Sequence, residues 1–495
     1  MTPVALGVGI YVAIVLAVGL AAARRSAGDP AEYFLAGRGL GAFVLFMALF
    51  GTNCTAFVLV GVPGQAYANG IATFGVNAPI VALGIPLTFY FIGLPARRLG
   101  QELGALTPAE LYAKRLDSRA VGLLLFGVFT LYTLPYMATA VQGAAVTLST
   151  ATEGALPEWA GGLGVLVVAL VYTSLGGMRA TAWTNVVQGA LFLGFVLAAV
   201  VVYTRAVGAE YGGGVAGAFE RVAAERPDLL ERPSGGLHAP RAFASWGLAI
   251  SLTVIAFPHM LARLMAAKDA RSLRSTCRAY PIALALLWVP VVLIGVFGAL
   301  EFPGLEGREV DRVFSQMAGR FLSPELSVLA VVAVLAAVMS TLDAQLLTLG
   351  SMLTRDVLDP LMPNRREGAD VLRGRLFAVA LAAVVYALWW FGGASVFRLA
   401  SVAFSGYVTL VPTLFLGVRW AGFTAAGAAL SIVLGNAVYF AALHAAGGLT
   451  AAMEPSWGGF LPVAWGFAAA CAGALLGSRA TGARRHRTEL RRLRT

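Results

Sequence analysis

The stretch Ala337-Val338-Met339-Ser340-Thr341-Leu342-Asp343-Ala344-Gln345-Leu346-Leu347 places two hydroxyls and a carboxylate in the middle of an apolar segment of roughly 30 residues. A segment of this length and composition is predicted to cross a membrane as a helix. Polar side chains are expensive in hydrocarbon unless they face a cavity or a partner, so Ser340, Thr341 and Asp343 are candidate functional residues. Hydroxyl and carbonyl oxygens are hard ligands that suit sodium. The alternative is that both hydroxyls bond carbonyls of their own helix.

Composition extends the membrane prediction to the whole chain. Of the 495 residues, 59% are hydrophobic and 12% are charged, and the mean hydropathy is +0.79, which is too apolar for a soluble protein of this size. The three cysteines lie far apart and offer neither a disulfide framework nor a zinc site. The net charge of +11 comes from short basic loops, which indicates membrane topology rather than nucleic-acid binding.

About thirteen segments are long enough to cross a bilayer, which predicts an all-α polytopic fold. The first segment follows no basic region and lacks a small-residue cleavage site, so it is expected to be a retained helix rather than a signal peptide. The segments are expected at residues 3–23, 40–69, 76–96, 119–151, 159–178, 180–205, 243–266, 278–302, 325–354, 374–396, 397–418, 422–446 and 459–478.

Basic residues gather in alternate loops and predict the orientation of the chain. Short loops rich in Arg and Lys stay in the cytoplasm, so the N-terminus is expected outside and the C-terminus inside. The basic tail, residues 479–495, is expected to be an orientation signal that also touches anionic lipid. The basic loops run from Arg24 to Arg38, Arg97 to Arg115, Arg263 to Arg278 and Arg365 to Arg375.

Two of the predicted segments look broken, about 200 residues apart. Gly51-Thr52-Asn53-Cys54-Thr55 interrupts one with polar and flexible residues, and Ala256-Phe257-Pro258-His259 places a proline in the other. Proline removes an intrahelical hydrogen bond, and carbonyls freed at such breaks can bind a cation. Paired broken segments in two halves of a chain indicate a secondary transporter built from inverted repeats. A simple kink at Pro258 is the alternative.

Several motifs resemble those of the sodium:solute symporter family, which includes the bacterial proline permease. The run from Gly176 to Gly189, GGMRATAWTNVVQG, resembles the family signature, and EYFLAGRGLG from Glu32 to Gly41 is similar to the family's sequence before the first broken helix. Met339-Ser340-Thr341 resembles the sodium-binding helix, and Thr354-Arg355-Asp356 its end. Pro258 to Arg263 is similar to proline permease, and Leu134 to Ala138 to monocarboxylate permeases.

The resemblance implies a LeuT-type fold with two inverted five-helix repeats, at residues 40–205 and 243–418, within one transporter domain spanning 1–495. It implies sodium-coupled import of a small organic solute by alternating access in a bacterial-type inner membrane, with sodium as co-substrate and no enzyme activity. The implied sodium ligands are the carbonyls of Gly51, Cys54 and Ala337 and the hydroxyls of Ser340 and Thr341. This ligand set agrees with the prediction made from the residues alone, in which the broken helix supplies carbonyls and the intact helix supplies hydroxyls.

The candidate solute contacts are Phe57, Tyr136, Thr253 and Phe257, beside the two breaks and on the fourth predicted segment. An aromatic residue at such positions is more often packing between helices. A monocarboxylate or an amino acid is expected, because the N-termini of half-helices favour carboxylates. Phe57 stands where proline permease has Trp, which argues against proline itself. No unpaired Arg or Lys is evident at the centre of a segment to fix an anion.

Candidate coupling or gating residues are Asn53, Asn185, Gln188, Asp343 and Pro258. Asn53 and Asn185 stand where proline permease and the family signature, respectively, carry aspartate, which removes negative charge from the cation path. We therefore predict one sodium per solute, because a neutral amide is a poorer partner for a cation than a carboxylate.

Three alternatives remain open at this stage. A proton-coupled transporter of the same fold is one, with His259 as a possible carrier, although helix-end capping is the commoner role for such a histidine. A solute sensor that acts with a partner is the second, and a channel is the third. The oligomeric state is left open.

Overall fold

The computed structural model describes residues 3–23, 30–361 and 368–492. Within these residues the chain is helical and contains no β-strand, which confirms the all-α prediction. One isolated bridge pairs Leu40 with Ala267 and joins the start of one broken segment to the end of the other. Two of the predicted basic loops lie partly outside the described residues, at Arg24-Arg25 and Arg365-Arg366.

The first half of the chain contains the first broken segment, α3 followed by η2 and α4. The long helix α9 covers two predicted segments, because the chain continues through Gly177, whose φ of 60° breaks the helical conformation without ending the helix. The helices are α1 (Pro3–Ala23), α2 (Pro30–Leu35), α3 (Ala42–Asn53), η2 (Phe57–Gly61), α4 (Val62–Asn69), α5 (Ala72–Thr88), α6 (Leu94–Glu102), α7 (Pro108–Arg115), α8 (Arg119–Ala151) and α9 (Glu158–Val207).

The second half contains the second broken segment, α11 followed by α12, and the helix α15 that carries Ser340 and Thr341. The helices are α10 (Gly214–Glu225), α11 (Pro240–Ala256), α12 (Pro258–Met265), α13 (Ala270–Glu301), η7 (Glu309–Arg312), α14 (Val313–Phe321), α15 (Pro324–Met352), η8 (Leu353–Leu358), α16 (Asp359–Leu361), α17 (Gly368–Gly392), α18 (Val396–Val408), α19 (Val411–Arg419), α20 (Ala425–Ala445) and α21 (Pro462–Arg492).

Nine helical stretches of the described chain are long and apolar enough to cross a membrane, and eleven if each bent pair counts as one span. The bent pairs are Ala42–Asn53 with Phe57–Asn69, at 53°, and Pro240–Ala256 with Pro258–Met265, at 52°. Both breaks therefore fall where the sequence predicts them. The two remaining predicted segments correspond to the shorter apolar helices Glu158–Val171 and Leu376–Gly392.

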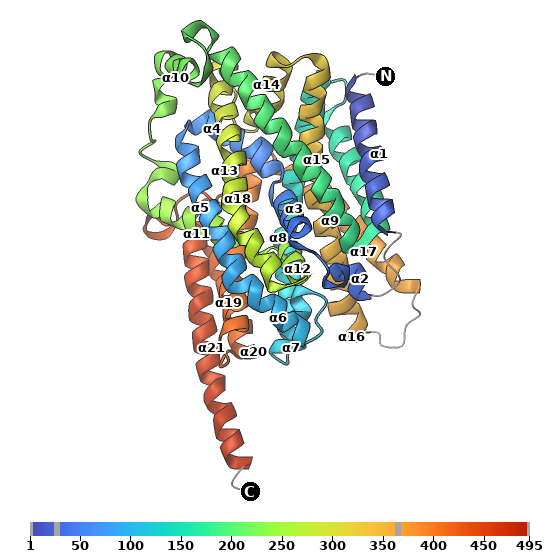
Figure 1. Ribbon diagram of the computed structural model, residues 1–495. Coiled ribbons are helices and arrows are strands. Elements are labelled where there is room, and N and C mark those ends of the chain that lie inside the picture. Colours follow the sequence, from blue (N-terminus) through green and yellow to red (C-terminus); the bar gives the residue numbers. More distant parts are fainter. Residues whose placement is uncertain (1–2, 24–29, 362–367, 493–495) are drawn as a thin grey trace.

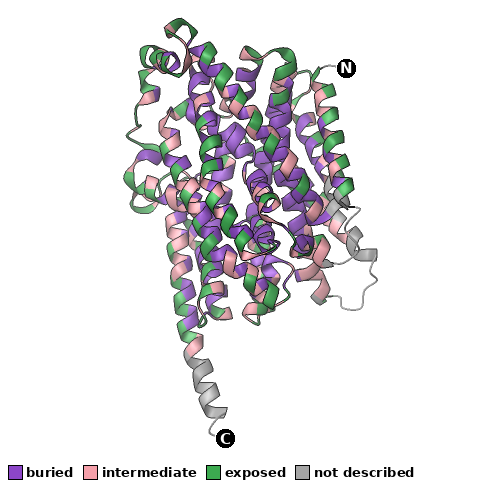
Figure 2. Cartoon of the chain, viewed as in Figure 1, coloured by how far each residue is buried: buried purple, intermediate pink, exposed green. Residues whose placement is uncertain are grey.

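Helix α15 lies inside the bundle: its residues 330–349 are all buried, like the interior residues coloured purple in Figure 2. It packs against α9, α8, α1 and α3, and 78% of its most apolar window is buried inside the protein. Apolar composition alone would also suit a lipid-facing helix, as in α1, where only 17% of the corresponding window is buried; the burial of α15 therefore comes from its packing against the other helices. The polar residues on α15 therefore face other helices rather than solvent.

The two ends of the bundle differ (Figure 1). Helix α1 begins at the same end of the bundle as α10 and α14, and α21 runs out of the opposite end, where α6, α7 and α16 lie. Three of the predicted basic loops contribute Arg38, Arg97, Lys114 and the C-terminal end of α12 to this second end. We call it the basic end.

Candidate functional site

The first break exposes backbone carbonyls to α15. Helix α3 ends at Asn53, and Cys54 leaves the helical conformation with φ −90° and ψ 87°. The hydroxyl of Thr55 then accepts a hydrogen bond from the Phe57 amide at 3.0 Å, which restarts the chain as a helix. The carbonyls of Gly51 and Thr52 are left without a continuing helix to satisfy them.

The hydroxyls of Ser340 and Thr341 provide hydrogen-bond donors for these two carbonyls. Ser340 Oγ lies 2.9 Å from the Gly51 carbonyl oxygen and 2.8 Å from that of Ala337. Thr341 Oγ1 lies 3.1 Å from both the Thr52 and the Ala337 carbonyl oxygens. Each hydroxyl has one proton, so each can donate to one of its two neighbours at a time. Bonds within α15 and bonds across to α3 are thus both available.

Five buried oxygens converge between α3 and α15: three carbonyls and two hydroxyls. An all-oxygen set of this kind fits an alkali cation. Four of the five predicted ligand residues, Gly51, Ala337, Ser340 and Thr341, lie together here. The carbonyl facing Thr341 is that of Thr52, a residue that the sequence analysis did not select. Cys54 is buried two residues farther along the break.

The second break separates α11 from α12 at Phe257, which has φ −69° and ψ 120°. Helix α12 begins with Pro258, whose lack of an amide proton is harmless at a first helical position. Phe257 packs 4.8 Å from Tyr136 between ring centroids. Thr253 lies one turn before the break and is buried, and its hydroxyl has no hydrogen-bond partner in the described part of the chain.

Three of the four predicted solute residues, Phe57, Tyr136 and Phe257, meet around Phe404 of α18. The ring of Phe404 lies 4.9 Å from Phe57, 5.3 Å from Tyr136 and 5.7 Å from Phe257, and Tyr407, one turn on, lies 5.0 Å from Phe257. We call these five residues the aromatic cluster. Neither α18 residue was predicted from the sequence, because an aromatic side chain in an apolar helix carries no signal of which neighbours it contacts.

His259 and Arg263 lie one turn apart on α12, and both are fully buried. The His259 ring stacks on Phe257 at 5.4 Å, and neither ring nitrogen has a hydrogen-bond partner among the described residues, so the capping role considered from the sequence is absent. Arg263 donates from Nη1 to the Ala48 carbonyl at 2.5 Å and contacts the Thr52 hydroxyl. This arginine was expected in a basic loop, but it is buried against α3.

The candidate coupling residues on α9 lie beside this arginine. Asn185 contacts the Thr52 hydroxyl at 2.6 Å, and Gln188 Nε2 donates to the hydroxyl of Tyr11 on α1 at 2.8 Å. Asp343 is fully buried on α15, two residues after Thr341. Asn53, the last residue of α3, is half-buried.

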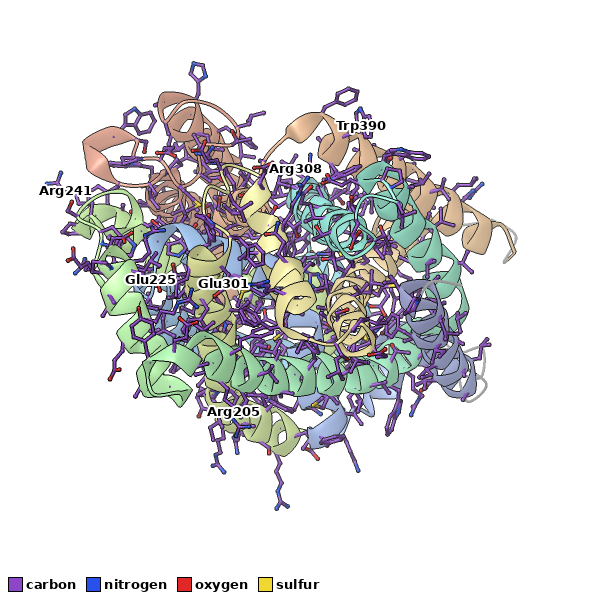
Figure 3. All side chains as sticks on the ribbon, turned by 90° about the horizontal axis from the view of Figure 1, so that it is seen from above. Arg205, Glu225, Arg241, Glu301, Arg308 and Trp390 are labelled. Carbon is purple, nitrogen blue, oxygen red and sulfur yellow. The ribbon has the colours of Figure 1, made fainter. Side chains whose placement is uncertain are left out.

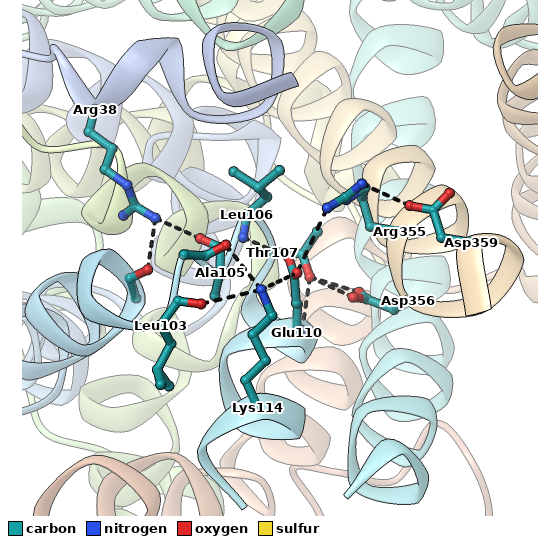
Figure 4. Close-up of polar contacts among 12 residues, drawn as sticks. Arg38, Leu103, Ala105, Leu106, Thr107, Glu110, Lys114, Arg355, Asp356 and Asp359 are labelled. Atoms are coloured by element: carbon teal, nitrogen blue, oxygen red, sulfur yellow. Dashed lines mark hydrogen bonds and ion pairs between the residues drawn. The ribbon is translucent and has the colours of Figure 1, made fainter. Parts of the chain in front are cut away.

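Polar residues from several segments meet at the basic end (Figure 4). Asp356 accepts from the Thr107 hydroxyl at 2.8 and 2.9 Å, and Arg38 donates to the carbonyls of Gly100 and Ala105 at 2.9 and 2.6 Å. Nearby, Arg179 of the signature run pairs with Glu32. These contacts join η8 to the start of α7 and α9 to α2 at this end of the bundle.

At the opposite end, which Figure 3 shows from above, η7 bonds to α9, to α8 and to the start of α18. Arg308 pairs with Glu158 of α9 at 2.7 Å and lies over the Trp389 ring at 5.5 Å. Asp311 is buried and accepts hydrogen bonds from the Val396 amide at 3.0 Å and from a glutamine of α8 at 3.2 Å. A cavity of about 340 Å³ lies between η7, α4 and the start of α18.

Comparison with known families and relatives agrees with the resemblance seen in the sequence. The profile of the sodium:solute symporter family matches residues 33–435. The osmoregulated proline transporter OpuE of Bacillus subtilis is 29% identical over 459 residues, covering 87% of each chain. A sodium/proline symporter of Haemophilus influenzae is 28% identical over 453 residues, covering 87% of this chain and 86% of its own.

Two solved structures have a similar fold. A substrate-bound, outward-open Na+-coupled sialic acid symporter superposes with a TM-score of 0.78 at 16% identity, over 97% of this chain and 98% of its own. The nucleobase-cation-symport-1 family transporter Mhp1, in a closed conformation, has a TM-score of 0.57 at 15% identity, over 91% and 94% of the two chains. At these identities the likeness concerns the fold.

Proposed function

Since the chain belongs to the sodium:solute symporter family, a family of membrane transporters rather than enzymes, we propose that it imports a small organic solute together with sodium by alternating access. The observation that carries this proposal is the convergence of the Ser340 and Thr341 hydroxyls on the Gly51 and Thr52 carbonyls at the first break. Sodium bound there takes lone pairs from both hydroxyls and ties α3 to α15.

Coupling follows from the shared broken segment. The break that supplies the sodium carbonyls continues into Phe57 of the aromatic cluster. Sodium that fixes α3 and η2 also fixes one wall of the solute site, so each ligand favours the conformation that binds the other, and the linkage is reciprocal. The near-equal bends of 53° and 52° at the two breaks support inverted repeats at residues 40–205 and 243–418.

We propose that the solute is a small monocarboxylate or amino acid held in the aromatic cluster, at Phe57, Tyr136 and Phe257 beside Thr253. The rings provide a compact apolar wall, and the Thr253 hydroxyl offers a buried polar atom that lacks a partner among the described residues. The N-terminus of α12 opens onto the same wall and favours a carboxylate. The named proline transporters among the relatives agree with this solute class.

The basic end is proposed to face the cytoplasm, with the N-terminus of α1 outside. Short loops rich in Arg and Lys stay on the cytoplasmic side, and Arg38, Arg97 and Lys114 lie at this end. In this orientation the cavity beside η7 faces the outside, and the ion pairs of Figure 4 close the path to the cytoplasm.

Transport into proteoliposomes tests the function. A screen of radiolabelled monocarboxylates and amino acids, with and without an inward sodium gradient, should find uptake that depends on sodium. The double variant Ser340→Ala, Thr341→Ala should then require at least tenfold more sodium for half-maximal uptake, because two ligands are removed. Ser351→Ala is the matched control, since this hydroxyl of α15 bonds the Leu347 carbonyl of its own helix at 2.6 Å. An unaltered sodium dependence in the double variant would refute the site. Uptake driven by a pH gradient alone would favour a proton-coupled transporter.

A further inference from the structure

Helix α1 lies at the edge of the bundle beside α9 and α15 (Figure 1), and it precedes both proposed repeats. Its 21 residues carry a single polar side chain, that of Tyr11. Most of the helix is exposed on the outside of the bundle, yet Tyr11 is buried, and so is Val15 one turn further on. The helix therefore turns its one hydroxyl away from the lipid and into the protein.

The Tyr11 hydroxyl begins a series of side-chain hydrogen bonds that crosses α9. It accepts from Gln188 Nε2 at 2.8 Å. The hydrogen-bonding pattern of Asn185 favours the amide orientation in which its nitrogen donates to Gln188 Oε1 at 2.9 Å and its oxygen accepts from the Thr52 hydroxyl at 2.6 Å. Gln188, Asn185 and Thr52 are fully buried. Three consecutive bonds thus lead from α1 to α3, and we call these four residues the polar row.

The polar row ends at the proposed sodium site. The carbonyl oxygen of Thr52 lies 3.1 Å from Thr341 Oγ1 and is one of the five oxygens between α3 and α15. Helices α3 and α9 approach closely here, since a Cβ added to Gly51 would lie 2.9 Å from the Asn185 carbonyl oxygen. Helix α3 ends one residue after Thr52, so no further helical turn holds this carbonyl. The contacts of the Thr52 side chain with Asn185 and Arg263 restrain it instead.

We propose that Tyr11 is a positioning residue for sodium: through Gln188 and Asn185 it restrains Thr52, so that α1 raises the sodium affinity of a site that it does not touch. This inference rests on the proposed sodium site. Residues that hold a ligand residue in place contribute to metal affinity nearly as ligands do. Successive hydrogen bonds also polarise one another, so removal of the last acceptor weakens the bonds before it.

The opposing view is that Tyr11 only fastens α1 to the bundle, as polar side chains between membrane helices commonly do. In that case the loss of its hydroxyl lowers thermal stability and leaves sodium affinity as it is. The proposal requires a weaker sodium affinity, with solute affinity at saturating sodium unchanged, because no residue of the polar row belongs to the aromatic cluster. Sodium binding measured without solute therefore separates positioning from fastening.

The experiment measures equilibrium binding of radiolabelled sodium, without solute, to purified variants in proteoliposomes. Tyr11→Phe keeps the ring and its packing but removes the hydroxyl, and the half-saturating sodium concentration should rise about three- to tenfold, as for one lost hydrogen bond. Gln188→Met interrupts the polar row at a similar side-chain volume and should have an effect at least as large. The double variant should stay within about twofold of Gln188→Met, because both changes interrupt the same row.

Val15→Ala is the matched control. Val15 is buried against the bundle from the same side of α1, so its truncation should lower the melting temperature while sodium affinity stays within about twofold of the wild type. The inference is overturned if Tyr11→Phe leaves sodium affinity unchanged, or if Val15→Ala weakens it equally. A Ser340→Ala, Thr341→Ala variant that binds sodium like the wild type would overturn the proposed sodium site itself, and this inference with it.

Discussion

Replacing Asp311 with Asn is expected to remove the pH dependence of the contact that closes the end of the bundle opposite the basic end. Asp311 is 1% exposed. One carboxylate oxygen accepts from the Val396 amide and from Gln142, and the other has no hydrogen-bond partner among the described residues. Burial raises the pKa of the Asp311 carboxyl to about 7, against the smaller lowering effects of those two hydrogen bonds and of Arg308, while Glu158 raises it slightly.

The sign follows from proton binding in the closed and open forms. While η7 is closed, the Asp311 carboxyl holds its proton up to about pH 7; once water reaches it, the proton is lost above a pKa of about 3.9. The closed form thus binds more protons between these values, so acid stabilises it and rising pH weakens it. From about pH 5.5 to about pH 8 the opening equilibrium should increase roughly 30-fold, or about 2 kcal/mol.

Hydrogen–deuterium exchange of peptides covering residues 305–321, corrected for intrinsic exchange rates at each pH, measures this opening. The wild type should lose protection by up to about 30-fold over that pH range, and Asp311→Asn should show a flat, acid-like profile because the amide is neutral throughout. Glu309→Gln is the control, since Glu309 is an exposed acid of the same turn and its loss should leave the slope intact. Equal pH profiles in the wild type and Asp311→Asn would refute the reasoning.

Three further outcomes are expected. Tyr136→Ala should raise the solute concentration for half-maximal uptake about tenfold with little effect on sodium binding measured without solute, whereas Leu131→Ala, on the exposed side of the same helix, should change neither; equal losses would contradict the cluster. The reversal potential in proteoliposomes should correspond to one sodium per solute, because Asn185 is neutral, and a ratio of two would show that prediction to be wrong. Gly51→Ala would place a Cβ 2.9 Å from the Asn185 carbonyl, and should lower stability by about 1–3 kcal/mol and weaken sodium binding; Gly41→Ala, with nothing within 4 Å, should not, and equal melting temperatures for the two would contradict this packing.

The sequence by itself determined the features that depend on neighbouring residues along the chain. Apolar length specifies a helix that can cross a bilayer, so the bundle and its approximate segments were predictable. Polar and proline residues interrupt such helices locally, so the breaks near Cys54 and Phe257 were predictable as well. The hydroxyls of Ser340 and Thr341 are adjacent in the sequence and lie within an apolar segment, so this half of the candidate sodium site was predictable too.

The tertiary structure alone decided which of these local features meet. Arg263 reads as part of a basic loop, and its burial beside Thr52 became visible once α12 was packed on α3. Phe404 lies about 350 residues from Phe57 in the chain, yet their rings are 4.9 Å apart. Apolar membrane helices present nearly uniform surfaces, so their order and rotation come from side-chain packing and interhelical hydrogen bonds between distant segments. The hydrophobic periodicity of a single segment therefore does not predict those contacts.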